Sequence, residues 1–224
     1  MEIPGFDGER REITGSYFPA GEISKRGEKM KKKRIVFTGG PSGGKTSIIE
    51  IVQRHYGNNV VSVPEAASIL YGGGFPRRPG DTAMRHIQRA IYFTVRELED
   101  MSSALDNARL YLCDRGTLDN IAYWPESAAE SFLKSVGSTM KKEIARYDMV
   151  IHLRPPKKSD VYKLSGTRIE DHKGALELDK RTEEAWSAHP RRFVISDEPD
   201  FLIKVEKALK IIEEEMGPVR NPGV

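Results

Sequence analysis

The chain has 224 residues, a formal net charge of +3 and one cysteine, with 38% hydrophobic and 31% charged residues. This length and composition predict a globular protein with one domain, or one domain with tails. The small net charge argues against binding to nucleic acid or to an anionic membrane, and no apolar run is long enough for a membrane span or a signal peptide. Cys113 has no partner for a disulfide, which predicts a reduced, cytoplasmic protein.

Residues 1–32 differ from the rest of the chain. They show no sustained hydrophobic periodicity and are rich in glycine and charge, which predicts a flexible extension. The basic run "KRGEKMKKKR" (25–34) is either a nucleic-acid or nuclear-import signal or a solvated flank of the first strand, and we favour the flank. The folded domain is predicted at 33–216, and a tail rich in Pro and Gly at 217–224.

The stretch "RIVFTGGPSGGKTSIIEIV" (34–52) predicts a phosphate-binding loop. Gly39, four further residues and then Gly44, Lys45 and Thr46 complete the spacing G-x-x-x-x-G-K-[ST]. The loop follows a short β-branched apolar run and precedes apolar residues at helical spacing. The alternative is a glycine-rich turn that happens to precede a lysine, and the strand and helix on either side argue against it.

Each residue type in this loop has a chemical purpose. Glycine lets the backbone curl so that its N–H groups face the β-phosphate, and the positive end of the following helix adds to that field. Lys45 is placed to reach the β- and γ-phosphates of ATP or GTP, and the Thr46 hydroxyl to ligate Mg²⁺. The predicted nucleotide-binding residues are Gly39, Gly40, Pro41, Ser42, Gly43, Gly44, Lys45, Thr46 and Ser47.

Five short apolar runs predict β-strands. They are "RIVFT" (34–38), "VVSV" (60–63), "RLYLC" (109–113), "MVIHL" (149–153) and "RFVIS" (192–196). Helical patterns separate the runs, and the longest pattern covers 81–108. Its apolar stripe consists of Ile87, Ile91, Val95, Leu98 and Met101. Strands that alternate with helices predict an α/β fold, with a parallel sheet covered by helices on both faces.

In such sheets ligands bind beyond the carboxyl ends of the strands, so the residues there are the candidates for function. Asp114, after the third strand, is either a Walker B aspartate that holds Mg²⁺ or a turn residue paired with a neighbouring cation. Arg115 either donates two hydrogen bonds to a phosphate or forms a surface ion pair. Glu65, after the second strand, either takes the proton of an attacking hydroxyl or interacts with the dipole of the next helix.

Two loops carry further basic residues. "KKSDVYKLSGTRIEDHKG" (157–174) has the composition of a mobile cover, in which Arg168 would close over the phosphates and stabilise the transferring charge. A plain solvated loop is equally consistent with this composition. "GFPRRPGD" (74–81) contains Arg77 and Arg78, which either hold an anionic acceptor or are simply exposed.

These motifs together resemble the AAA-type, kinase-like P-loop ATPase family that includes the ribosylnicotinamide kinase domain. The resemblance rests on "RIVFTGGPSGGKTS", "VPEAA", "DRGTLDNIAYW" and "TRIED…ALELDKRTEEAWSAHPRRFVIS", and it covers about residues 33–212. The order of the motifs is also similar to that of the deoxynucleoside kinases. The resemblance implies a P-loop NTPase fold, a three-layer sandwich with the sheet order 2-3-1-4-5 and a lid segment between strands four and five.

The resemblance also implies roles for individual residues. Glu65 would be the catalytic base, Arg115 a phosphate or acceptor contact, and Arg168 a lid arginine. Asp119 would orient Arg115 or the acceptor. The deoxynucleoside kinases usually continue the acid–arginine pair with Ser, whereas this chain has Gly116, so their sugar recognition is not transferred to it.

Two functions remain open at this point. The first is a Mg·NTP-dependent kinase of a nucleoside-like molecule, in which Lys45 and Arg168 stabilise the γ-phosphoryl group and Glu65 orients the acceptor hydroxyl. The second is a regulatory ATP- or GTP-binding switch with slow hydrolysis, although the chain lacks the guanine-reading N-K-x-D tetrapeptide. A mechanical or DNA-remodelling ATPase ranks last, because the chain is short and its charge nearly balanced. The acceptor, the preferred nucleotide and the oligomeric state are left open.

Overall fold

The computed structural model of the protein describes residues 32–125, 128–156 and 172–216. The predicted N-terminal extension up to residue 31, the tail at 217–224 and the loop segment that contains Arg168 lie outside the described residues. The expectations for these segments therefore stay predictions.

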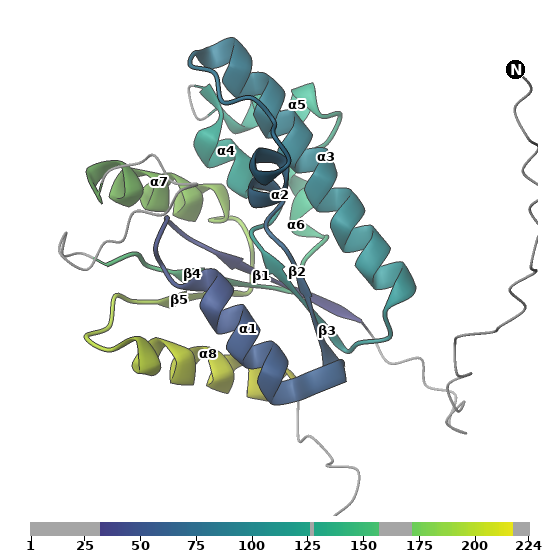
Figure 1. The fold of residues 1–224 in the computed structure, drawn as a ribbon, viewed down its shortest axis with the longest axis vertical. Helices are drawn as coiled ribbons and strands as arrows, with labels where there is room; N and C mark the ends of the chain where they lie inside the picture. Colours follow the sequence, from purple (N-terminus) through teal and green to yellow (C-terminus); the bar gives the residue numbers. More distant parts are fainter. Residues whose placement is uncertain (1–31, 126–127, 157–171, 217–224) are drawn as a thin grey trace, which may run out of the picture. The chain divides into compact units, whose positions relative to one another are not determined.

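Five parallel strands form one sheet in the order β2-β3-β1-β4-β5, as predicted (Figure 1). Each strand begins and ends within one residue of a predicted apolar run. The strands are β1 (Lys33–Thr38), β2 (Val60–Val63), β3 (Leu110–Asp114), β4 (Met149–Leu153) and β5 (Arg192–Ile195). The β3 and β4 runs are buried along their whole length, which explains why they read as continuous apolar sequence rather than as an alternating pattern.

Helices cover both faces of this sheet (Figure 1). On one face, α1 (Lys45–Tyr56) and α8 (Phe201–Met216) pack against side chains such as Phe37 and Leu112. The opposite face buries the alternate residues of the same strands, including Tyr111, because successive strand side chains point to opposite sides. The remaining helices are η1 (Gly57–Asn59), α2 (Ala66–Gly72), α3 (Asp81–Leu105), α4 (Asp119–Tyr123), α5 (Ala129–Ser135), α6 (Met140–Ile144) and α7 (His172–Ala185). None of the helices in the described part of the chain has both the length and the apolar character to cross a membrane.

The predicted apolar stripe of α3 is only partly correct. The stripe is buried as far as Val95, whereas Met101 is 52% exposed. The buried residue in this part of the helix is Glu99, which accepts hydrogen bonds of 2.6 Å from Arg146 Nη2 and from Tyr147 Oη. A paired carboxylate thus occupies the inward position, and a hydrophobic pattern does not reveal it.

Cys113 lies in β3 and is 1% exposed. Burial, with a smaller contribution from the Glu99 carboxylate, raises the pKa of the thiol well above its ordinary value. Because the thiolate is the nucleophilic form, this cysteine is a structural residue of the core.

Gly116, the second residue after β3, provides a test of the packing. A Cβ atom there would lie 2.7 Å from Val36 Cγ2 and 2.8 Å from Trp186 Cζ2. We expect Gly116→Ala to lower the free energy of unfolding by about 1–3 kcal/mol, because the added methyl group overfills a packed core. Urea unfolding followed by circular dichroism measures this change.

Gly72→Ala is the matched control, because a Cβ atom at Gly72 has no neighbour within 4 Å. Its free energy of unfolding should stay within about 0.5 kcal/mol of wild type or rise. Equal destabilisation by the two substitutions would contradict the packing argument.

Candidate active site

The predicted phosphate loop connects β1 to α1 and contains three residues with positive φ. These angles are 116° at Gly39, 63° at Ser42 and 90° at Gly44. A Cβ atom at Gly39 would lie 2.3 Å from the carbonyl oxygen of Leu153, so only glycine fits there. A tightly curled backbone of this kind is typical of loops whose N–H groups converge on an anion.

Lys45 is the first residue of α1 and is 7% exposed. Its Nζ donates hydrogen bonds to the carbonyl oxygens of Gly39 (3.1 Å) and Gly40 (2.8 Å). Burial, together with the nearby charge of Arg115, lowers the pKa of Lys45 to about 8. The lysine is thus folded back onto its own loop, where a negative phosphate would compete with two neutral carbonyl groups for the ammonium.

Thr46 and Asp114 lie together at the end of the loop. Thr46 Oγ1 donates to Asp114 Oδ2 at 2.5 Å. Asp114 Oδ1 is buried and has no hydrogen-bond partner among the described residues, and burial raises the pKa of this carboxyl group. Mg²⁺ prefers oxygen ligands and commonly takes only one or two from the protein. This pair of residues therefore fits Mg²⁺, and the described residues contain no cluster of three or more His, Cys, Asp or Glu that would offer another metal site.

Arg115 follows β3 in a left-handed backbone conformation, with φ of 71°. For a residue with a side chain this conformation costs on the order of 1–3 kcal/mol. Its Nε donates to Glu65 Oε1 at 2.7 Å, and its Nη1 donates at 3.2 Å to both Asp119 Oδ1 and the Gly39 carbonyl oxygen. The Arg115 side chain is 13% exposed and the Glu65 side chain 29%, so this is a partly buried ion pair rather than one on the surface.

Glu65 lies between β2 and α2 and is held by two donors. Its Oε1 accepts the bond from Arg115, and its Oε2 accepts a bond of 2.6 Å from Ser68 Oγ. Burial alone would raise the pKa of Glu65, but Arg115, Ser68 and Lys45 outweigh burial and hold the pKa at about 2. The carboxylate is consequently ionised at neutral pH.

Asp119 begins α4 and is 3% exposed. Its Oδ1 accepts bonds from Thr38 Oγ1 and Arg115 Nη1, and its Oδ2 accepts bonds from the Gly116 amide and Trp186 Nε1. Each carboxylate oxygen thus has two donors, which fills its lone pairs. This arrangement favours the orientation of Arg115 over direct contact with an acceptor.

One cavity of about 290 Å³ joins these residues. The predicted site residues that line it are Pro41, Gly44, Lys45, Thr46, Ser47, Glu65, Arg77, Asp114, Arg115 and Asp119. Helices α2, α3 and α4 supply a further wall. Its side chains are Tyr71, Met84, Gln88, Ile91, Val95, Asn120 and Tyr123. The cavity thus has a phosphate-loop end and a largely apolar and aromatic end, while Arg168 lies outside the described residues.

Several residues near the cavity were missed by the sequence interpretation. Gln88 is 4% exposed in α3, and its spacing of three from Ile91 and seven from Val95 is a signal that could have found it. Asn120 is 2% exposed, and its Oδ1 has no hydrogen-bond partner among the described residues. Asp179 and Trp186 come from the segment after β4 and contact the loop and Asp119, and no local spacing marks them as site residues.

Residues 34–201 match the family described as the AAA domain. The chain belongs to this family. Among solved structures, deoxyadenosine kinase from M. mycoides with bound dATP is similar, with a TM-score of 0.55 and 13% identity over 81% of this chain and 99% of that chain. The likeness at this identity concerns the fold, and with the family match it confirms the predicted kinase-like P-loop NTPase fold. No curated protein sequence matches the chain.

The lowered pKa of Lys45 leads to a prediction about proton uptake. Bound Mg·ATP should raise this pKa from about 8, because phosphate oxygens replace neutral carbonyls as the partners of the ammonium. At pH 8.5 the free lysine is mostly neutral, so binding should take up a large part of one proton. At pH 7 the lysine is charged in both states, and the uptake should be small.

Isothermal titration calorimetry in two buffers of different ionisation enthalpy measures this uptake. Lys45→Met removes the titrating group, so the difference between the two pH values should disappear in that variant. An equal uptake in the variant and the wild type would contradict the assignment to Lys45.

Proposed function

We propose that the protein is a Mg·NTP-dependent phosphotransferase that acts on a hydroxyl group of a small, nucleoside-like molecule. The cavity of about 290 Å³ carries this proposal, because it joins the phosphate loop to a second compartment walled by side chains. A switch that only hydrolyses its nucleotide needs water at the γ-phosphate and has no use for a second compartment. The likeness of the fold to a deoxyadenosine kinase supports the same function.

The phosphate-loop end would hold the nucleotide. The loop amides and the positive end of α1 attract the β-phosphate, and Lys45 would leave the carbonyls of Gly39 and Gly40 for the γ-phosphate. Thr46 and Asp114 would hold Mg²⁺, which would supply positive charge to offset the negative charge of the nucleotide phosphates. None of these contacts would involve the base, so they would not distinguish ATP from GTP.

Glu65 would orient the acceptor hydroxyl. Each of its oxygens bonds one protein donor in the structure, which leaves each a lone pair for a further hydrogen bond. With a pKa of about 2 the carboxylate is a weak base, and it would act mainly by aligning the hydroxyl. In the transfer step the acceptor oxygen bonds the γ-phosphorus, the bond from that phosphorus to the bridging oxygen of the diphosphate breaks, and the hydroxyl proton passes to Glu65 late in the step.

The acceptor end suits a flat heteroaromatic group. Apolar side chains of α3 and the rings of Tyr71 and Tyr123 would cover the faces of such a group. The amides of Gln88 and Asn120 would meet its polar edge. Arg77 lies with Cζ 3.8 Å from the centre of the Tyr71 ring and extends this wall with a positive charge. The predicted closure of Arg168 over the phosphates remains part of the proposal.

The test is a search for phosphoryl transfer. Mg·ATP or Mg·GTP is incubated with a panel of nucleosides, ribosides and vitamin-like alcohols, and new phosphate esters are detected by mass spectrometry. We expect Glu65→Gln to lower kcat about 100-fold, because the neutral amide aligns the hydroxyl poorly and cannot take its proton. Nucleotide affinity should change far less.

Glu50→Gln is the matched control, because it makes the same chemical change on the exposed side of α1. Its transfer rate should equal that of the wild type. The kinase proposal is wrong if no acceptor yields an ester while the NTP binds tightly to both the wild type and Glu65→Gln. That result would favour the regulatory switch.

A further inference from the structure

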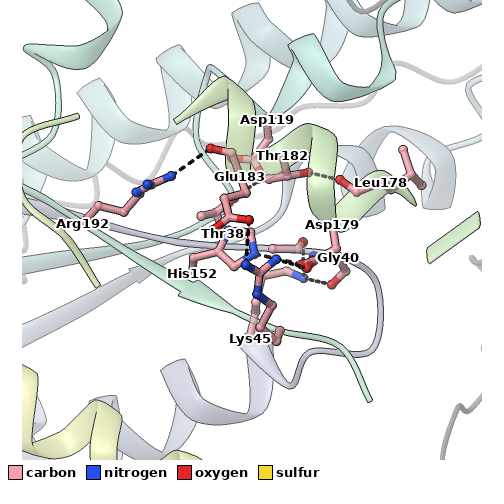
Figure 2. Close-up of polar contacts among 12 residues, drawn as sticks. Thr38, Gly40, Lys45, Asp119, His152, Leu178, Asp179, Thr182, Glu183 and Arg192 are labelled. Atoms are coloured by element: carbon pink, nitrogen blue, oxygen red, sulfur yellow. Dashed lines mark hydrogen bonds and ion pairs between the residues drawn. The ribbon is translucent and has the colours of Figure 1, made fainter. Parts of the chain in front are cut away.

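Helix α7 packs directly on the phosphate loop through a buried carboxylate. Asp179 is 3% exposed, and Figure 2 shows it beside Gly40. It accepts hydrogen bonds from the Gly40 amide (2.8 Å), from His152 Nε2 (2.8 Å) and from Arg154 Nη1 (2.7 Å). The donors come from the loop, from β4 and from the residue that follows β4.

The approach of α7 to the loop leaves no space for a larger residue. A Cβ atom at Gly40 would lie 2.8 Å from the Ala175 carbonyl oxygen and 2.9 Å from Asp179 Cβ. The buried face of α7 consists of Ala175, Asp179, Thr182 and Ala185, so one acid stands among small residues. A buried carboxylate is costly unless it is paired, and here Arg154 and His152 provide the pairing while the Gly40 amide is the third donor.

Burial would raise the pKa of Asp179, but hydrogen bonds from His152 and Arg154 outweigh burial and lower it. The residue is therefore a carboxylate that only accepts hydrogen bonds, and His152 donates through Nε2. An ionised acceptor makes a stronger bond to the Gly40 amide than a neutral one would.

The contacts of the loop converge on a single peptide unit. The carbonyl oxygen of Gly39 accepts from Lys45 Nζ and Arg115 Nη1, and the N–H of Gly40, in the same peptide plane, donates to Asp179. Glycine on both sides makes rotation of this plane easy, because neither residue has a Cβ atom to oppose it. A rotated plane would turn its carbonyl oxygen away from the two cations and change the electrostatic field of the loop.

We propose that Asp179 is a positioning residue for nucleotide binding, which locks the orientation of the Gly39–Gly40 peptide so that the loop is preformed for a triphosphate. The inference rests on the nucleotide-binding half of the proposed function and is independent of phosphoryl transfer. Preformed loops bind more tightly because less ordering has to occur on binding.

Two variants and a matched control test this role. Asp179→Ala removes the acceptor, and Asp179→Asn keeps an oxygen for the Gly40 amide but loses the charge. Glu183→Gln is the control, because Glu183 bonds Arg154 Nη2 at 2.6 Å one turn further along α7 and has no hydrogen bond to the loop. Amide hydrogen exchange at Gly40 is measured without nucleotide, and the Kd of Mg·ATP is measured by calorimetry.

We expect faster exchange at Gly40 and a Kd raised about tenfold in Asp179→Ala, the equivalent of one charge-assisted hydrogen bond. Asp179→Asn should show a smaller rise, and Glu183→Gln should match the wild type in both measurements. If Asp179→Ala does not fold, Asp179→Asn alone decides the question by its comparison with Glu183→Gln.

The inference is overturned if folded Asp179 variants bind Mg·ATP as the wild type does, or if Glu183→Gln weakens binding equally. A wild type that binds neither Mg·ATP nor Mg·GTP would overturn this inference together with the proposed function. A wild type that binds nucleotide but phosphorylates no acceptor contradicts only the proposed function, so the two failures are distinguishable.

Discussion

Arg115 brings one positive charge against two carboxylates, the partly exposed Glu65 and the buried Asp119. These residues follow β2 and β3, and the same guanidinium also bonds the Gly39 carbonyl after β1. The three strands are neighbours in the sheet, so the ion pair joins their carboxyl ends. Loss of Arg115 would leave the buried Asp119 carboxylate without its ion-pair partner. The strained backbone at Arg115 persists because these contacts together determine its position.

The strands and the phosphate loop were predictable from the sequence because their signals are local. Buried parallel strands require consecutive apolar residues, and a curled anion-binding loop requires glycines at fixed positions, as at Gly39 and Gly44. The sheet order has a different source. Hydrophobic periodicity predicted only the class of fold. The resemblance to kinase-like P-loop proteins predicted the strand order that the structure has.

What the sequence could not reveal depends on contacts between distant segments. Asp179 lies 139 positions from Gly40, and Trp186 lies 67 positions from Asp119. No spacing rule relates such pairs. The prediction that Met101 belongs to the buried stripe was wrong for a similar reason. Glu99 takes the inward position instead, because partners on other elements pair with its carboxylate. The left-handed backbone at Arg115 carries no sequence mark, since glycine, the usual residue for that conformation, comes only one position later.

Cys113 combines three properties: it is the only cysteine in the chain, it is buried in the central part of the sheet, and its thiol resists ionisation. Maleimide and alkylating reagents attack thiolates that solvent can reach, so the native protein presents no site for them. A cysteine introduced on the surface would therefore be the sole labelling position, without prior removal of the natural one. Cysteines introduced on two helices could therefore be labelled selectively for fluorescence or spin-label distance measurements.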